Sequence, residues 1–164
     1  MKKITCLAGA LALAISFSSC KKSDSTTTVT PAAQSTLYDR LGKIENIRKV
    51  VDTFINNVAA DNTINAKFGP TISSTDKDAQ GNNLRLRALK INLIDQVCNA
   101  TGGPCTYNGL AMADAHKGMN ITEAEFNALV GDLSKALDSN GAAAADRDAL
   151  LSALGMMKGD IVGK

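Results

Sequence analysis

The side chain best suited to bind a metal is the single histidine of the chain, His116. Histidine is the commonest metal ligand in proteins, and a neutral imidazole suits iron. Most solitary histidines are nevertheless ordinary surface or core residues, so His116 alone does not predict a site. Its interpretation depends on the surrounding pattern, which runs from Gly102-Gly103-Pro104 through Tyr107 to Thr122.

Cysteine is the other reactive residue type, and two of the four cysteines, Cys98 and Cys105, flank Gly102-Gly103. Outside the cytoplasm such a pair can be oxidised, and a disulfide here would clamp the end of a long helix to the segment before His116. Two free buried thiols are the alternative. The spacing is not the C-x-x-C-H pattern of covalent haem attachment, and two cysteines with one distant histidine do not make a zinc site.

The first 19 residues have the layout of a secretory signal peptide. Positive Lys2 and Lys3 precede an apolar run, 4–17, which is too short for a comfortable transmembrane helix. The ending Phe17-Ser18-Ser19-Cys20 resembles a bacterial lipoprotein cleavage site, with Phe17 in place of the usual Leu. We therefore expect residues 1–19 to be removed, Cys20 to be lipidated, and the protein to be anchored in the bacterial cell envelope, on the periplasmic side or at the cell surface. Ordinary secretion is the alternative.

Residues 20–35 are rich in Ser and Thr and have too few apolar side chains to fold, which predicts a flexible tether. The length then leaves one domain, 36–164. Its aromatic content is low, at 4% of the whole chain, so the core is expected to be aliphatic and helical. The formal charge of +2 includes Lys2 and Lys3, and without them it is zero, which excludes the electrostatic footprint of a nucleic-acid-binding protein.

Apolar residues recur at spacings of three and four over long stretches of the domain, which predicts an all-α fold. Thr122 with Glu125 is a capping box, and Gly102-Gly103-Pro104 is a helix stop. Gly69-Pro70 predicts that residues 64–70 form only a brief turn. The expected long helices are 43–60, 84–101, 122–140 and 143–162, with short helices at 36–42 and 110–116 and a polar loop at 71–83.

The order of these motifs resembles that of the group 1 truncated haemoglobins, over about Thr36 to Val162. The residues that carry the resemblance are Thr36-Leu37-Tyr38-Asp39-Arg40-Leu41-Gly42, Val50-Val51-Asp52-Thr53-Phe54, Val58-Ala59-Ala60-Asp61, Phe68, Gly102-Gly103-Pro104, Tyr107, Gly109, Ala115-His116-Lys117-Gly118, Ile121-Thr122 and Phe126. The resemblance implies a two-over-two helical sandwich that encloses haem b, iron protoporphyrin IX.

The resemblance also implies roles for single residues. His116 would be the proximal ligand of the haem iron, which leaves the sixth position open to a diatomic gas. Phe68 would pack on the haem face. Further porphyrin contacts would come from Leu86, Leu89, Met112 and Phe126, although plain core residues would show the same burial.

The expected distal pocket departs from the family. Group 1 globins usually place a Tyr directly after the Phe of the second helix, where this chain has Ile55. Counting back from Gly102-Gly103, the distal Gln position falls on Leu93. Ile55, Leu89 and Leu93 would then form an apolar distal pocket, unless an offset of one turn brings in Gln96 as a hydrogen-bond donor.

The resemblance implies reversible binding of O₂, NO or CO by a haem protein, which the expected lipid on Cys20 would tether to a membrane. The enzymatic alternative is NO dioxygenation or a peroxidase-like reaction at the same iron, which needs a reductase partner and usually a polar distal group. The apolar pocket argues against that alternative. A haem carrier, or a structural relic that has lost haem, is the third hypothesis.

Overall fold

The computed structural model describes residues 35–164, so the predicted signal peptide and Cys20 lie outside the described residues. The described part is all-helical, as predicted from the sequence, and no helix in it is both long and apolar enough to cross a membrane. The helices are α1 (Leu37–Arg40), α2 (Lys43–Ala60), α3 (Asn65–Ile72), α4 (Leu84–Ala100), α5 (Met112–Ala115), α6 (Glu123–Ser139), α7 (Ala144–Gly155) and a 3₁₀ turn, η1 (Lys158–Asp160).

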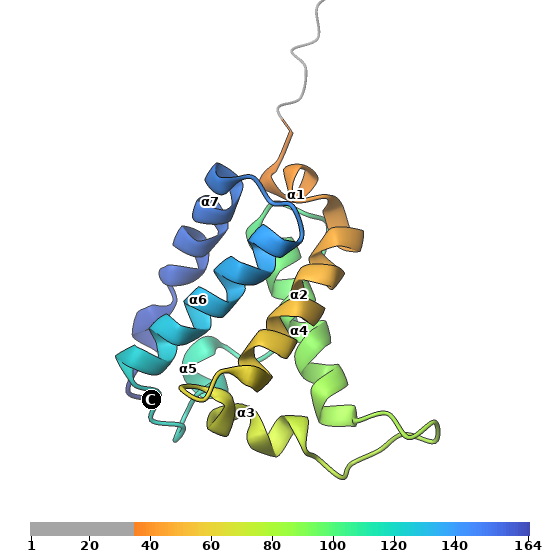
Figure 1. Ribbon diagram of the computed structural model, residues 1–164, viewed down its shortest axis with the longest axis vertical. Helices are drawn as coiled ribbons and strands as arrows, with labels where there is room; N and C mark the ends of the chain where they lie inside the picture. Colours follow the sequence, from red (N-terminus) through yellow and green to blue (C-terminus); the bar gives the residue numbers. More distant parts are fainter. Residues whose placement is uncertain (1–34) are drawn as a thin grey trace, which may run out of the picture. The chain divides into compact units, whose positions relative to one another are not determined.

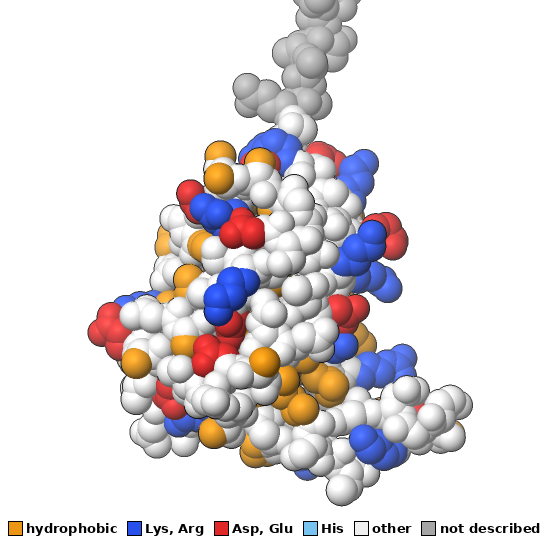
Figure 2. Space-filling model, in the orientation of Figure 1, with side chains coloured by type: hydrophobic (Ala, Val, Ile, Leu, Met, Phe, Trp, Pro, Cys, Tyr) orange, Lys and Arg blue, Asp and Glu red, His pale blue; other side chains and the backbone are white. Residues whose placement is uncertain are grey.

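The four longest helices form two packed pairs (Figure 1). Helix α2 lies against both α4 and α6, and α7 lies beside α6. The short helices α3 and α5 lie near one end of these pairs (Figure 1). On the face shown in Figure 2, positive and negative side chains are interspersed, and apolar side chains gather where α2, α3 and α4 meet.

Helix α2 supplies much of the core because its apolar residues follow the helical period. Its buried side chains are Ile47, Val50, Val51, Phe54, Ile55 and Val58. They pack in one cluster with Leu137 of α6 and Leu150 of α7, both of which are almost fully buried. Burying one such side chain contributes about 1.5–3 kcal/mol, so this stripe fixes α2 between its neighbours.

The predicted capping box at the start of α6 is confirmed. The Thr122 hydroxyl accepts a hydrogen bond from the Glu125 N–H at 3.2 Å, and the Glu125 carboxylate accepts one from the Thr122 N–H at 2.8 Å. Two backbone donors that the helix itself leaves unpaired are thus satisfied. The cap fixes where α6 begins, directly after the segment that carries His116.

Two predicted elements are wrong in extent. Residues 64–70 were expected to form a brief turn, but α3 continues through Gly69 and Pro70 to Ile72. Pro70 stands in the second half of this short helix, where it removes only one backbone hydrogen bond. The last helix was expected to reach Val162 but ends at Gly155. The chain then turns through η1, and Val162 forms a parallel bridge with Ile121 instead.

Candidate functional site

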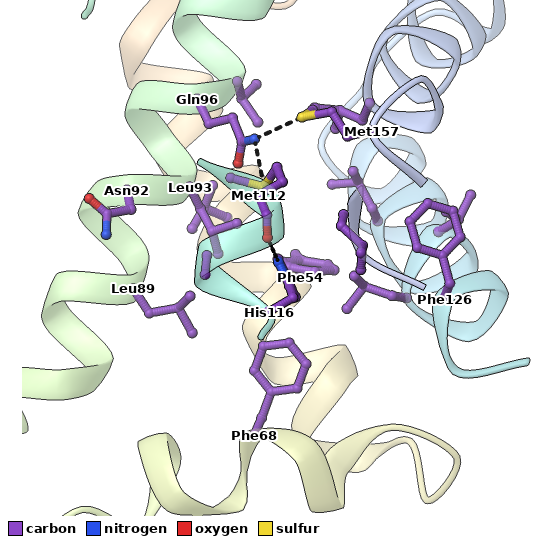
Figure 3. A pocket seen from close by; sticks show the side chains of 18 of the residues that line it. Phe54, Phe68, Leu89, Asn92, Leu93, Gln96, Met112, His116, Phe126 and Met157 are labelled. Carbon is purple, nitrogen blue, oxygen red and sulfur yellow. Dashed lines mark hydrogen bonds between the residues drawn. The ribbon is translucent and has the colours of Figure 1, made fainter. Parts of the chain in front are cut away.

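A cavity of about 340 Å³ lies within the helical domain, and every helix from α2 to α7 contributes side chains to its wall (Figure 3). Its volume is in the range of small-molecule and cofactor sites. Most of the wall is apolar, as in Phe68 of α3, Leu93 of α4 and Leu129 of α6. The polar side chains that reach it are Lys67, Thr71, Asn92, Gln96, Tyr107 and His116.

His116 caps the C-terminal end of α5 and lies in the cavity wall. Its Nδ1 atom is 2.8 Å from the carbonyl oxygen of Met112 (Figure 3). A carbonyl oxygen can only accept, so Nδ1 carries a hydrogen, and in the neutral ring Nε2 is then the nitrogen with the lone pair. Metal-binding histidines commonly use this arrangement, in which one ring nitrogen is anchored to a backbone carbonyl and the other binds the metal.

The structure brings most of the sequence-predicted site residues into this one wall. Besides His116, they are Phe68, Leu89, Leu93, Gln96, Met112 and Phe126. Leu86 is not among the lining residues; it is half-buried and packs against the aliphatic core.

Ile55 was expected to line the distal pocket, but it is not among the residues of the cavity wall. Ile55 is 4% exposed and belongs to the aliphatic core, whereas its neighbour Phe54 lines the cavity together with Val51. Successive residues of an α-helix point about 100° apart. Ile55 therefore points about 100° round the helix from Phe54, and its side chain packs in the aliphatic core.

The predicted alternative donor, Gln96, has its amide nitrogen directed at two thioethers. The Nε2 atom is 3.2 Å from the sulfur of Met157 and 3.5 Å from that of Met112 (Figure 3). A thioether sulfur is a weak acceptor. Through these two contacts the Gln96 amide nevertheless links α4 to α5 and to the segment after α7. Its N–H groups therefore point at sulfur atoms.

Sequence reasoning missed several residues of the wall, among them Lys67, Tyr107, Thr71 and Asn92. Tyr107 carried part of the family resemblance, but its position in the wall was not foreseen. Its hydroxyl donates to the carbonyl oxygen of Leu110 at 2.9 Å and so braces the segment before α5. Lys67 precedes Phe68, and no local pattern indicates where its side chain reaches.

Cys98 and Cys105 form a disulfide, with their Cα atoms 5.7 Å apart. Cys98 is fully buried in the last turn of α4, and Cys105 lies two residues before Tyr107. The turn between them needs glycine, because a Cβ atom at Gly103 would lie 2.8 Å from the carbonyl oxygen of Cys98. The disulfide therefore ties the end of α4 to the segment that leads to His116.

Removing this disulfide by the double change Cys98→Ser and Cys105→Ser should lower the free energy of unfolding by about 2 kcal/mol, the value expected for closing so short a loop. Urea denaturation of both proteins measures the difference. The wild type with excess reductant is the matched control and should approach the double variant. A wild type whose midpoint does not move with reductant would show that the pair is not oxidised in solution.

Comparisons with known proteins agree with this architecture. The sequence profile of the bacterial-like globin family matches residues 36–162. A group 1 truncated haemoglobin from a Nostoc species is 32% identical over 130 residues, which cover 79% of this chain and 99% of that protein.

Solved structures show the same fold. The truncated haemoglobin of Tetrahymena pyriformis in its Fe(III) form superposes with a TM-score of 0.68 at 25% identity, over 79% of this chain and all of that one. The 2/2 haemoglobin of a Synechococcus species, in the cyanomet state and with covalently attached haem, gives 0.65 at 22% identity, over 78% and 98%. Helix order, cavity and sequence thus agree, and the chain is a group 1 truncated haemoglobin of the bacterial-like globin family.

Proposed function

We propose that the protein binds haem b in this cavity and reversibly binds a diatomic gas, O₂, NO or CO, at the iron. The observation that carries the proposal is His116, which lines the cavity with Nδ1 committed to the Met112 carbonyl and Nε2 left as a ligand. It is the only imidazole of the chain. The membership of the globin family supports the same conclusion.

The residues present fit a haem. The wall is largely apolar, as a porphyrin requires, and Phe68 enters the cavity from α3 while His116 enters from the end of α5 (Figure 3). Cys98 and Cys105 are paired with each other, so neither is available for a thioether bond to a vinyl group. His116 would hold the haem, and the bound haem would supply an iron that can bind a diatomic gas.

Absorption spectroscopy tests this proposal on the full-length protein. Reconstitution with one equivalent of haem should give a Soret band that shifts on reduction with dithionite and again on addition of CO. If the absorption spectrum of haem in the presence of the protein were the same as that of haem in buffer alone, the proposal would be overturned. Retention of haem without a shift on CO would instead favour the haem-carrier hypothesis.

The enzymatic alternative, NO dioxygenation or a peroxidase-like reaction, requires a reductase and usually a polar group at the gas-binding face. Helix α4 lines the cavity with Leu89, Leu93 and Val97 and with the polar Asn92 and Gln96, and the Gln96 amide is directed at two methionine sulfurs. This largely aliphatic surface favours gas binding over turnover. NO consumption measured in the presence of O₂ and an electron donor distinguishes the two, because a dioxygenase converts many equivalents of NO to nitrate per protein, whereas a gas-binding globin stops after one.

We further propose that the globin domain is anchored in the bacterial cell envelope by lipid on Cys20, with residues 20–35 as its tether. The disulfide supports this location, since structural disulfides persist mainly outside the cytoplasm. Several acyl chains, each stabilised by about 0.8 kcal/mol per buried CH₂, would hold the protein firmly.

The change Cys20→Ser should move the protein from the membrane fraction to the soluble fraction, because lipidation requires the thiol. Fractionation followed by immunoblotting measures the shift, and mass spectrometry of the mature N-terminus checks for acylation. Cys98→Ser with Cys105→Ser is the control and should not change the fraction. An unchanged partition of Cys20→Ser, with no acyl mass on the wild type, would indicate simple secretion.

A further inference from the structure

The lysine beside Phe68 joins two parts of the cavity wall that are far apart in sequence. Lys67 lies in α3, and its ammonium group donates to the carbonyl oxygen of Met119 at 2.8 Å, with a longer contact of 3.5 Å to that of Asn120. Both Lys67 and Met119 line the cavity. The side chain thus connects the wall that carries Phe68 to the turn that directly follows His116.

The ammonium of Lys67 is held in place by a carboxylate. Glu125 lies 3.6 Å away, and the two side chains are only 27% and 18% exposed. Glu125 is itself fixed by the capping box with Thr122, whose N–H, with a smaller contribution from Lys67, keeps the pKa of Glu125 below its ordinary value. The carboxylate is therefore charged at neutral pH, and a long flexible side chain acquires one preferred position.

The turn after His116 is tight and passes its position on to His116. Gly118 has φ +77° and Asn120 has φ +47°, the left-handed conformation that glycine and asparagine adopt more readily than other residues. The N–H of Met119 donates to the carbonyl oxygen of His116 at 3.0 Å, so a shift of Met119 would be transmitted to His116. On its other side the turn pairs with the C-terminal segment, where the Gly163 N–H donates to the Ile121 carbonyl at 2.9 Å.

The helix that precedes His116 cannot fix it alone. Helix α5 has four residues, far fewer than a helix needs to be stable by itself. Before α5, the disulfide and the Tyr107 hydroxyl restrain the chain. After His116, the Asn120 amide bonds within the turn, to the Gly118 carbonyl oxygen at 3.3 Å, and Lys67 is the side chain that ties the turn to another helix.

We propose that Lys67 is a positioning residue that fixes the orientation of His116 toward the iron, by holding the carbonyl groups of Met119 and Asn120. This inference rests on the proposed haem function. The ammonium acts through the backbone of the turn, and the three-residue link from His116 O to Met119 N carries the restraint to the imidazole.

Hydrogen exchange on the full-length, haem-reconstituted protein tests the restraint directly. In Lys67→Met the amides of residues 117–121 should exchange at least ~10-fold faster, the equivalent of losing one charge-assisted hydrogen bond. Lys90→Met is the matched control. It also breaks a lysine–carboxylate contact between helices, with Asp52 at 2.7 Å, but does not touch this turn. Lys67→Arg should restore most of the protection.

Resonance Raman spectroscopy of the ferrous protein then tests the effect on the iron. Lys67→Met should shift or broaden the iron–histidine stretching band, and haem transfer to excess apomyoglobin should become ~10-fold faster. Lys67→Gln, which keeps N–H donors, should shift the band in the same direction and serves if Lys67→Met is too unstable to isolate. Lys67→Arg should resemble the wild type.

The two levels of the proposal fail in different ways. A wild-type protein that takes up no haem would overturn the proposed function and this role with it. A haem-bound Lys67→Met variant with exchange rates and a stretching band equal to those of the wild type would overturn the role of Lys67 alone. The experiments also distinguish positioning of His116 from a purely structural role of Lys67. In a purely structural role, Lys67→Met would speed hydrogen exchange throughout the domain and leave the iron–histidine stretching band unchanged.

Discussion

Replacing His116 with alanine should abolish stable haem binding. The loss of a group that only orients a metal ligand commonly costs 10–100-fold in metal affinity, so removal of the ligand itself should cost more than ~100-fold. Haem titration followed at the Soret band measures the affinity, and circular dichroism checks that the variant remains helical. Exogenous imidazole should partly restore the spectrum, because the change leaves a space in the cavity wall where the ring stood.

Asn92→Ala is a suitable control for this experiment. Asn92 also lines the cavity, but its side chain points away from its centre (Figure 3). The Asn92→Ala variant should therefore bind haem with nearly the same affinity as the wild type. If His116→Ala kept the haem content and the spectrum of the wild type, His116 could not be the ligand, and no second histidine exists to take its place.

Elements with a strong helical period could be predicted from the sequence, and those whose ends depend on tertiary contacts could not. The bounds of α2 agree with the predicted range of 43–60, because six buried side chains mark one face and Asp61 ends the pattern. The end of α7 was missed. Apolar residues continue to Val162, but the chain leaves the helix at Gly155 so that Val162 can pair with Ile121.

The site was predictable in part. His116 was identified because a family pattern surrounds it, and the cysteine pair was recognised as one of two alternatives. The direction of Ile55 was not predictable, since Phe54 and Ile55 are adjacent, both apolar and both buried. Periodicity cannot tell which of the two faces a cavity and which faces the core. The reach of Lys67 to Met119 spans 52 residues, and no local pattern encodes it.

O₂ should leave this protein ~10–100-fold faster than it leaves a relative with a distal Tyr or Gln. Bound O₂ carries partial negative charge, whereas CO stays nearly neutral, so a hydrogen-bond donor retains O₂ selectively. Such a bond is worth about 1.5–3 kcal/mol, and each 1.4 kcal/mol is about tenfold in affinity. The α4 side chains in the wall are Leu89, Leu93 and Val97 with Asn92 and Gln96, and the Gln96 amide is directed at two methionine sulfurs.

Stopped-flow displacement of O₂ by CO measures the rate, and Leu93→Gln should slow it ~10-fold or more by supplying the missing donor. CO dissociation should change far less in the same variant, which is the internal control. Ile55→Tyr should behave differently from Leu93→Gln. Because Ile55 is 4% exposed in the core, a tyrosine there should cost about 1–3 kcal/mol of stability through overpacking without slowing O₂ release.

Gln96→Leu decides whether the wild type already has a donor. Its amide donates to the sulfurs of Met112 and Met157, so its removal should leave the O₂ dissociation rate within about twofold of the wild type, a change worth less than ~0.5 kcal/mol. If instead the wild type releases O₂ slowly and Gln96→Leu speeds that release ~10-fold or more, the amide must turn from sulfur to the gas when haem is bound. The face of α4 that carries Gln96, rather than Leu93, would then be the distal one.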